Sequence, residues 1–440
     1  MSTWKGLNVV LAIVLAALLA LMTNCGDDGE TALPTQPTDT VQPTITVQSI
    51  ESTTPTEPLE DLTITIGSIT DKTAMASSAL SIVDMALTDV VEYFNDNSLI
   101  PGVELDVIFY DGQYDPAHDI PGYEWLKERG ADLMISPVPS VPLSVMRFLQ
   151  EDEMVLFSPS ATSEALDPPG WVFLMGSRPE VFVYTLLDWV AQNDWDYEQK
   201  GPAKVGAVGG MDAYALALQD GLEAYCKAHP DQFEWVDGFM VEWTVMTFAP
   251  EINALLDCDY VVAPSTGVQT FAFMKEFRES GGTAKYLGTA AQAAFLGLIY
   301  SAVSWDDLDG MLFALQDRWW NEQGYQLVDL TWDFLYQKHP DNVDVAVFGG
   351  VSYLGTVQTS YTILTLIERT IEEVGAQNFS GQALYETAQS FSITYDSGAE
   401  WSFTPTKRAA GDKVGIYRLS AVDEDLVRVD VDWYPIRLDP

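Results

Sequence analysis

Hydrophobic and polar residues along the chain predict strands that alternate with helices. Residues 63–69 predict a strand, and residues 79–94 repeat apolar side chains at helical spacing. Further strands are expected at 103–110, 132–135 and 154–157, with a helix at about 123–129. Because consecutive parallel strands need crossover helices, this order predicts a doubly wound parallel sheet.

The pattern restarts after a helix expected at about 182–193. The expected strands are 203–208, 239–241, 260–263 and one from 285, and the expected helices are 213–227 and 251–256. The fold class is therefore α/β, with two similar doubly wound parallel-sheet lobes joined by a multi-strand hinge.

The C-terminal part is expected to contribute to both lobes. Residues 353–374 predict a long helix against the first lobe, and residues 414–419 and 427–433 alternate like strands joined by an acidic turn. The expected boundaries are about 61–185 and 315–412 for lobe 1, and about 190–314 and 413–437 for lobe 2.

The N-terminus indicates export. Lys5 precedes an apolar stretch at 7–22, which suits a signal segment and is marginally short for a spanning helix. Cys25 follows that stretch and resembles the acylated cysteine of a bacterial lipobox, although Met22 and Asn24 depart from the usual residues. An uncleaved anchor and ordinary secretion are the alternatives, and all three place the body outside the cytoplasm.

Residues 26–60 are rich in Thr, Pro and acids and contain no aromatic residue. Such a segment buries too little apolar surface to order itself, so we expect a disordered tether between the signal segment 1–25 and a folded body at 61–440.

The chain has a formal net charge of −44, which repels nucleic acid and anionic lipid headgroups and disfavours both as direct partners. Its three histidines are scattered, so neither a metal site nor a cofactor is expected. Cys226 and Cys258 suit either a disulfide, which export permits, or two buried thiols.

A loop of hydroxyl residues at 158–163 (SPSATS) follows the apolar run 154–157. In open α/β sheets, ligands bind where loops leave the carboxyl ends of strands. Hydroxyls and free amides there can hold a carboxylate or an amide without a charged side chain. The alternative is a turn that caps the next helix.

The chain from about Leu62 to its end resembles the type 1 periplasmic binding proteins, in the branched-chain amino acid and amide branch of ABC-transporter substrate-binding proteins. Four stretches carry the resemblance by their order and spacing: 64–67, 102–116, 158–163 and 210–214. It implies hinge closure of two lobes around a small ligand and delivery to a membrane ABC permease.

The resemblance also implies a set of ligand-binding residues. Ser160 and Thr162 would offer hydroxyls and Ala161 a backbone amide, with Ser140 as a neighbouring donor. The second lobe would contribute Tyr214, Thr266 and Thr289. Ordinary turn chemistry is the alternative for Ser140 and Thr266, and a place in the lobe core is the alternative for Tyr214.

A departure from the family bears on the ligand. Amino acid binders of this branch pair the ligand's ammonium with a carboxylate after the strand that corresponds to 286–288, whereas this chain has Thr289 there. An unpaired buried ammonium is costly, so we expect a small amide, a urea-like compound or an organic acid. A branched-chain amino acid is the runner-up, with Asp212 as the nearby acid that could serve it.

The sequence favours binding over catalysis. It contains no Gly-x-Ser-x-Gly, His-Glu-x-x-His, P-loop or dinucleotide-binding motif, and its acids suit a solvated surface. A ligand-sensing receptor component of the same fold remains an alternative, and a hydrolase a remote one. The aromatic residues between 319 and 336 either line the cleft, contact the permease or pack in the interior.

Overall fold

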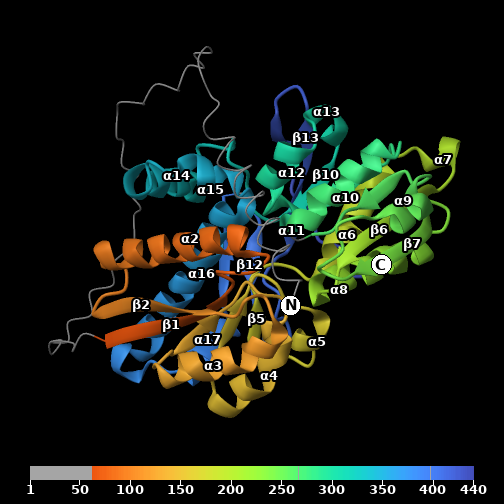
Figure 1. Ribbon diagram of the computed structural model, residues 1–440. Coiled ribbons are helices and arrows are strands. Elements are labelled where there is room, and N and C mark those ends of the chain that lie inside the picture. Colours follow the sequence, from red (N-terminus) through yellow and green to blue (C-terminus); the bar gives the residue numbers. More distant parts are fainter. Residues whose placement is uncertain (1–61, 266, 397) are drawn as a thin grey trace, which may run out of the picture. The chain divides into compact units, whose positions relative to one another are not determined.

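Two mainly parallel β-sheets, each with helices on both faces, form two lobes (Figure 1). The computed structural model describes residues 62–265, 267–396 and 398–440, which belong to one unit of the chain, Glu57–Pro440. The predicted signal segment 1–25 and the tether 26–60 lie outside the described residues. The two lobes confirm the predicted fold class.

The first sheet contains β1 (Leu62–Thr70), β2 (Val103–Asp111), β3 (Leu133–Ile135), β4 (Leu156–Ser158) and β5 (Val172–Leu174). The second contains β6 (Ala203–Gly210), β7 (Phe233–Val241), β8 (Tyr260–Val262), β9 (Lys285–Gly288), β10 (Leu312–Leu315), β13 (Lys413–Ser420), β14 (Asp425–Arg428) and β15 (Tyr434–Pro435). A separate small sheet pairs β11 (Ser392–Thr394) with β12 (Glu400–Ser402).

The α-helices in the first part of the chain are α2 (Ser77–Asp96), α3 (Asp119–Glu128), α4 (Val141–Asp152), α5 (Ser163–Leu166), α6 (Pro179–Asn193), α7 (Tyr197–Lys200), α8 (Ala213–Ala228), α9 (Ala249–Leu255) and α10 (Val268–Glu279). Those in the remainder are α11 (Ala290–Ala293), α12 (Leu296–Ala302), α13 (Trp305–Leu308), α14 (Gln326–Lys338), α15 (Val343–Phe348), α16 (Val351–Val374) and α17 (Gly381–Ala388). None of the helices within the described residues is long and apolar enough to span a membrane.

The two sheets share one strand order. The first runs β2-β1-β3-β4-β5, and the second repeats it as β7-β6-β8-β9-β10 before the antiparallel β13 and β14 extend its edge. In each sheet the order reverses beside the first strand, between β1 and β3 and between β6 and β8. Such reversal points are where doubly wound sheets bind ligands, at the carboxyl ends of the strands.

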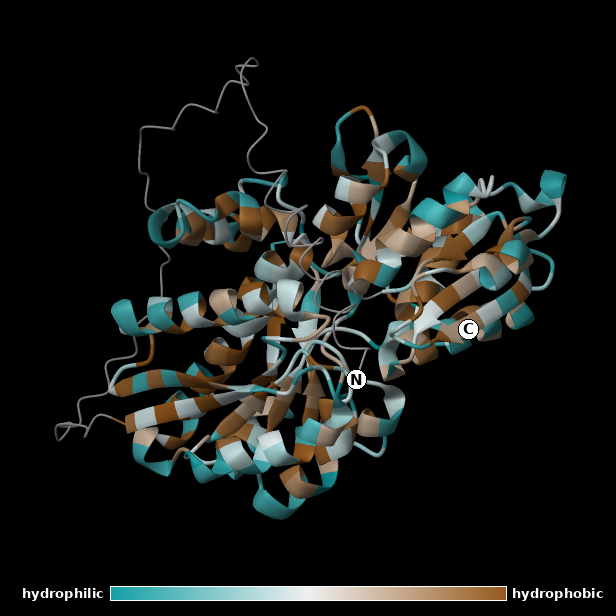
Figure 2. Ribbon diagram, in the orientation of Figure 1, coloured by the Kyte–Doolittle hydropathy of each residue, from teal (hydrophilic) through white to brown (hydrophobic). Residues whose placement is uncertain are grey.

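Helices cover both faces of each sheet because the strands are apolar on both sides. Ile64 and Ile66 of β1 pack with α2 and α16, whereas Ile69 packs with α3 and α4. In the second lobe, α6 and α8 share one core cluster, while α9, α10 and α12 belong to another. The apolar sheet strands and the polar outer faces of the helices are visible in Figure 2.

Three chain segments connect the two sheets and contact one another. They follow β5, β10 and β12. Gln316 Nε2 donates to Ser177 Oγ at 2.9 Å, and the Gly411 N–H donates to the Gly176 carbonyl at 3.0 Å. A Cβ on Gly411 would lie 1.7 Å from Gln316 Nε2, so any larger residue there would displace the Gln316 side chain. These three segments are called the hinge below.

Most predicted strands are present, and one differs. The strand expected at 427–433 ends at Arg428, because Asp430 Oδ1 accepts the Asp432 N–H at 2.9 Å and forms a turn there. Of the aromatic residues between 319 and 336, Trp319 and Trp320 are buried and Trp320 packs edge-on against Trp332, whereas Tyr336 is exposed.

Cys226 and Cys258 are buried free thiols. They belong to different core clusters of the second lobe, Cys226 with α6 and α8, and Cys258 with α9 and α10. Burial raises the pKa of each thiol to about 12, so neither forms a reactive thiolate near neutral pH.

Candidate functional site

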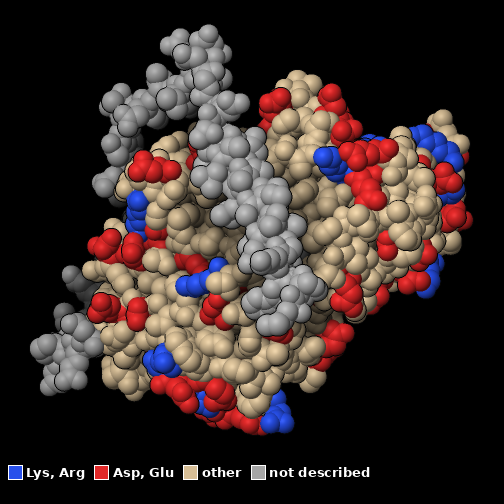
Figure 3. All heavy atoms as spheres, in the orientation of Figure 1, with Lys and Arg blue, Asp and Glu red and all other residues tan. Residues whose placement is uncertain are grey.

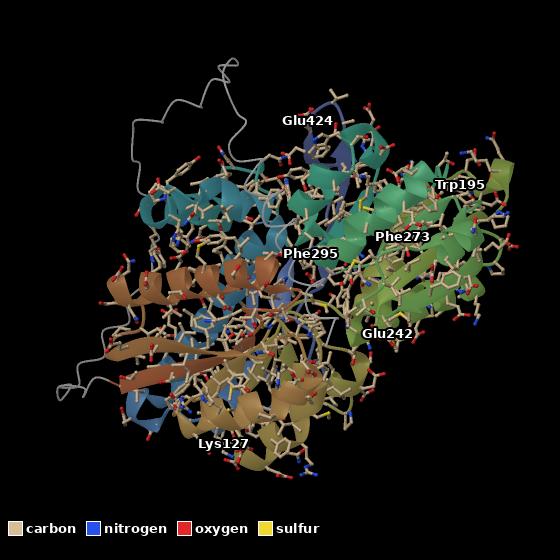
Figure 4. The ribbon with its side chains drawn as sticks, viewed as in Figure 1. Lys127, Trp195, Glu242, Phe273, Phe295 and Glu424 are labelled. Atoms are coloured by element: carbon tan, nitrogen blue, oxygen red, sulfur yellow. The ribbon has the colours of Figure 1, made fainter. Side chains whose placement is uncertain are left out.

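A cavity of about 210 Å³ lies at the carboxyl ends of strands from both sheets. Residues that end or follow a strand line it from the first lobe (Ser68, Pro137, Pro139, Pro159, Ser160, Met175), from the second (Asp212, Ser265, Ala290) and from the hinge (Gln316, Asp317). Phe295, labelled in Figure 4 where the lobes meet, also lines it. The cavity therefore occupies the position that the strand order predicts.

One helix contributes a second wall. The N-terminal half of α16 lines the cavity with small residues at helical spacing, Val351, Ser352, Gly355, Thr356, Thr359 and Ser360. A further wall, formed by α2, is apolar: Ala79, Leu80 and Val83 line the cavity there. A solute in this cavity would meet hydroxyls on one helix and apolar carbons on the other.

The Ser-Thr loop at 158–163 lies beside the cavity, but only part of it faces inward. Ser160 lines the cavity, and its hydroxyl oxygen is buried without a hydrogen-bond partner. The Ser160 N–H is already used, because it donates to Ser158 Oγ at 3.1 Å. Ala161 and Thr162 are buried and do not line the cavity, and Thr162 begins the four-residue α5 without a side-chain cap.

Ser140 lies at the start of α4 and outside the cavity lining. Its hydroxyl and that of Ser144 are hydrogen-bonded to Asp119, where burial raises the carboxyl pKa and the two hydroxyls partly oppose that rise. Thr266, the other predicted donor from a loop, lies outside the described residues, but its neighbour Ser265 is buried and lines the cavity.

Tyr214 and Thr289 form one hydrogen-bonded unit in the second lobe. Their hydroxyl oxygens are 2.8 Å apart, and Tyr214 lines the cavity whereas the fully buried Thr289 does not. Thr289 caps α11 together with Gln292: its hydroxyl can donate to Gln292 Oε1 at 3.2 Å, and Gln292 Nε2 donates to the Ala263 carbonyl at 3.1 Å. Thr289 therefore holds the Tyr214 hydroxyl in place through a hydrogen bond, without lining the cavity itself.

Either hydroxyl of the Tyr214–Thr289 pair can be the donor, because Thr289 Oγ1 also lies 3.2 Å from Gln292 Oε1 and its proton can go to either partner. The Tyr214 hydroxyl can therefore both accept and donate a hydrogen bond in the cavity.

Asp212 is the N-cap residue of α8, and its two carboxyl oxygens have different surroundings. Its Oδ1 accepts the Ala215 N–H at 2.7 Å and caps the helix, whereas its Oδ2 is buried without a hydrogen-bond partner. Burial raises the pKa of this carboxyl to about 6, against the opposing backbone N–H groups of Ala215 and Tyr214.

Asp317 in the hinge is a second cavity carboxyl, which the sequence analysis did not identify. It lies against α16, where a Cβ on Gly355 would be 3.2 Å from its Oδ2. Burial alone raises its pKa to about 7, since no charged or hydrogen-bonding group acts on it. The neighbouring Arg318 instead pairs with Glu322 at 2.9 Å and with Asp396 at 3.4 Å.

Two signals in the sequence could have identified the missed residues. Gln316 and Asp317 follow the short apolar run 312–315, which marks a buried strand end. The small polar residues at 352, 356 and 359 recur at helical spacing and mark one face of α16.

The cavity offers little catalytic chemistry. Its described lining contains Asp212 and Asp317 but no Lys, Arg or His. The described residues also contain no group of three His, Cys, Asp or Glu side chains that could hold a metal ion.

The chain resembles known proteins in sequence pattern and in fold. The family model described as periplasmic binding protein matches residues 63–423. A branched-chain amino acid ABC transporter protein from Thermus thermophilus, with bound valine, is 19% identical over 86% of this chain and 97% of its own, with a TM-score of 0.73. No curated protein matches the sequence.

Two further solved structures cover 86% of this chain. The fatty acid ABC transporter substrate-binding protein from Thermomonospora curvata is 16% identical over 94% of its length, with a TM-score of 0.72. A solute binding protein from Rhodopseudomonas palustris, in complex with 3,4-dihydroxy benzoic acid, is 17% identical over 99% of its length, with a TM-score of 0.67. At these identities the likeness concerns the fold.

Proposed function

Because the chain belongs to the periplasmic binding protein family, we propose that it is an extracytoplasmic solute-binding protein of an ABC importer. In this function the two lobes close around a small solute, and the closed form delivers it to a membrane permease. Closure of two lobes about a hinge is a known class of conformational change in solute binders.

One observation carries the proposal: a single cavity is lined by both lobes and by the hinge. Ser160 comes from the first lobe, Tyr214 from the second and Gln316 from the hinge. A solute that contacts all three residues binds more tightly to the closed conformation, in which they are close together, than to an open one. This difference in affinity stabilises the closed conformation.

The binding roles follow from this placement. Ser160 and Tyr214 would contact the solute directly. Thr289 would act through Tyr214, and Ala161 and Thr162 would hold the Ser160 loop against the first lobe. Ser140 and Thr266 stay predictions from the family resemblance.

The proposed solute is a small amide, an organic acid or a branched-chain amino acid. The three similar proteins named above differ in solute: one holds valine, one is a fatty acid binder and one holds 3,4-dihydroxy benzoic acid. Binding rather than catalysis is proposed, because the described cavity lining pairs no nucleophile with a histidine or lysine base.

We also propose that Cys25, outside the described residues, carries a lipid that anchors the mature chain to the cell membrane, with 26–60 as the tether. Cys25→Ala should yield soluble or unprocessed protein, whereas the wild type partitions into detergent with a diacylglyceryl mass increment. Unchanged partitioning and an unchanged N-terminus in the variant would contradict the anchor.

The binding proposal is tested by native mass spectrometry of the purified chain. We expect one non-covalent small molecule per chain, released on denaturation, which raises the melting temperature when returned to refolded protein. Thr356→Trp, which fills the cavity from α16, should abolish the adduct, and Gln192→Trp on the exposed face of α6 should retain it. An adduct that persists in Thr356→Trp would place binding elsewhere.

A further inference from the structure

The two charged groups of the described cavity lining, Asp212 and Asp317, are both carboxyls. Asp317 lines the cavity, Asp212 Oδ2 is buried and unpaired, and the Tyr214 oxygen can accept a hydrogen bond. No Lys, Arg or His among the described lining residues opposes them. A solute that supplies hydrogen-bond donors and positive charge would satisfy all three groups.

The same groups disfavour an anionic solute. A carboxylate in the cavity would lie near two carboxyls with no cation to compensate it, and like charges in a partly buried site repel strongly. The Ser160 N–H, which a carboxylate would need, is occupied by Ser158. The remaining donors are mainly neutral hydroxyls.

The rest of the lining is apolar. Phe182, Phe295 and Trp401 supply aromatic surface, and Leu80 and Val83 supply aliphatic surface. A small solute with a short hydrocarbon body would bury that body here while its polar end reaches the carboxyls.

The charge of the whole chain acts in the same direction. The formal net charge is −44, and acidic side chains are spread over both lobes in the view of Figure 3. Such a potential raises the local concentration of cations and lowers that of anions.

We infer that the solute is a small primary amine with an apolar body and no carboxylate, and that its ammonium pairs with Asp317 in the hinge. This inference rests on the proposed solute-binding function and replaces its amide or organic acid with a cation. Asp212 Oδ2 and the Tyr214 oxygen are the further acceptors for the ammonium protons. Because Asp317 lies in a hinge segment, this ion pair would connect binding of the solute to closure of the lobes.

Calorimetry with four solutes of similar shape tests the charge class: isoamylamine, isovaleramide, isovalerate and leucine. We expect isoamylamine to bind at least about tenfold more tightly than any of the other three. Tighter binding of the amide, the acid or leucine would overturn the inference. Failure of isoamylamine, isobutylamine and phenethylamine alike to bind would also overturn it.

Asp317→Asn removes the charge and keeps the shape. Isoamylamine affinity should fall about tenfold or more in this variant, while isovaleramide affinity stays or rises, so the selectivity reverses. The control is Glu424→Gln, an equal charge change at the exposed end of the second lobe labelled in Figure 4, which should alter affinity less than about twofold. Equal losses in both variants would show attraction by overall charge and would overturn the pairing with Asp317.

The two proposals fail in different ways. If a solute other than an amine is recovered from the protein and closes the lobes, the amine inference is wrong and the binding function stands. If no recovered solute binds in the cavity at all, the binding function itself is contradicted.

Discussion

At the scale of single residues, the carboxyls of the cavity lower the free energy of unfolding of the solute-free protein. Partial burial raises the pKa of the Asp317 carboxyl to about 7 in the folded chain. Its ordinary pKa in an unfolded chain lies near 4. As the pH rises from about 4 to 7, the unfolded chain releases this proton first, so the free energy of unfolding falls over that window.

Asp317→Asn should therefore stabilise the solute-free protein at pH 8 and leave it unchanged at pH 4. We expect a rise in melting temperature of about 1–3 °C at pH 8, measured by calorimetry. The titratable and charged groups around the site are Tyr395, Asp212 and the already paired Arg318. A gain that is the same at pH 4 and pH 8 would show that burial of charge is not its cause.

A variant of Tyr214 tests whether the hydroxyl of this second-lobe residue contacts the solute. Tyr214→Phe removes the hydroxyl that is 2.8 Å from Thr289 and should cost about 1 kcal/mol of stability and about fivefold in solute affinity. The control Tyr286→Phe loses a buried hydrogen bond to the Met274 carbonyl at 3.0 Å, away from the cavity lining. It should match the stability loss without the affinity loss. Matching losses of affinity in both variants would exclude a direct role for Tyr214.

At the scale of elements, α16 forms a cavity wall because Gly350, the residue just before the helix, makes a close backbone contact. Gly350 has φ +57°, and a Cβ there would lie 1.8 Å from the Ala293 carbonyl oxygen of α11. Trp320 Nε1 donates to the Gly350 carbonyl at 2.8 Å and fixes the same turn. The start of α16 is thereby held next to the second lobe.

Gly350→Ala should destabilise the protein by about 3 kcal/mol or more, measured by denaturant unfolding, since a backbone contact must open. The control is Gly375→Ala at the other end of α16, where φ is +80° and the nearest atoms belong to the flexible Gln377 side chain. That change should cost about 1 kcal/mol from the backbone conformation alone. Equal costs at both positions would exclude the α11 contact as the cause.

The elements also show how far the sequence could predict the fold. The strand β1 and the helices α2 and α16 were predictable because their hydrophobic repeats are long. The short strands β5 and β10 were missed, although an apolar run of similar length predicted β4, because such a run is equally compatible with a segment of a buried helix. With β10 unpredicted, Asp317 after it had no assigned place near the cavity.

The predicted site shows the same limit. Ser160 and Tyr214, which the family resemblance implied as binding residues, both line the cavity. Ser140 and Thr289 occupy the expected loops, but which way a hydroxyl faces depends on partners such as Asp119 and Gln292 that are distant or unremarkable in sequence.

At the scale of the whole molecule, a net charge of −44 should steer a cationic solute toward the cleft. The association rate of isoamylamine, followed by stopped-flow tryptophan fluorescence, should fall by about tenfold between low salt and 0.5 M NaCl. The rate for isovaleramide should change little. A salt-independent rate for the amine would contradict steering by the acidic surface.

The lobes also contact each other beside the cavity. Tyr114 of the first lobe and Trp243 of the second pack edge-on with ring centroids 6.0 Å apart, and Tyr114 lines the cavity. A solute that draws the lobes together should strengthen this contact, so solute affinity and compactness are coupled.

Small-angle X-ray scattering of the refolded, solute-free protein before and after return of its own released solute tests closure most directly. The account predicts that the radius of gyration decreases and that the change saturates at one solute per chain. Tight, saturable binding with an unchanged radius of gyration would contradict the hinge-closing mechanism.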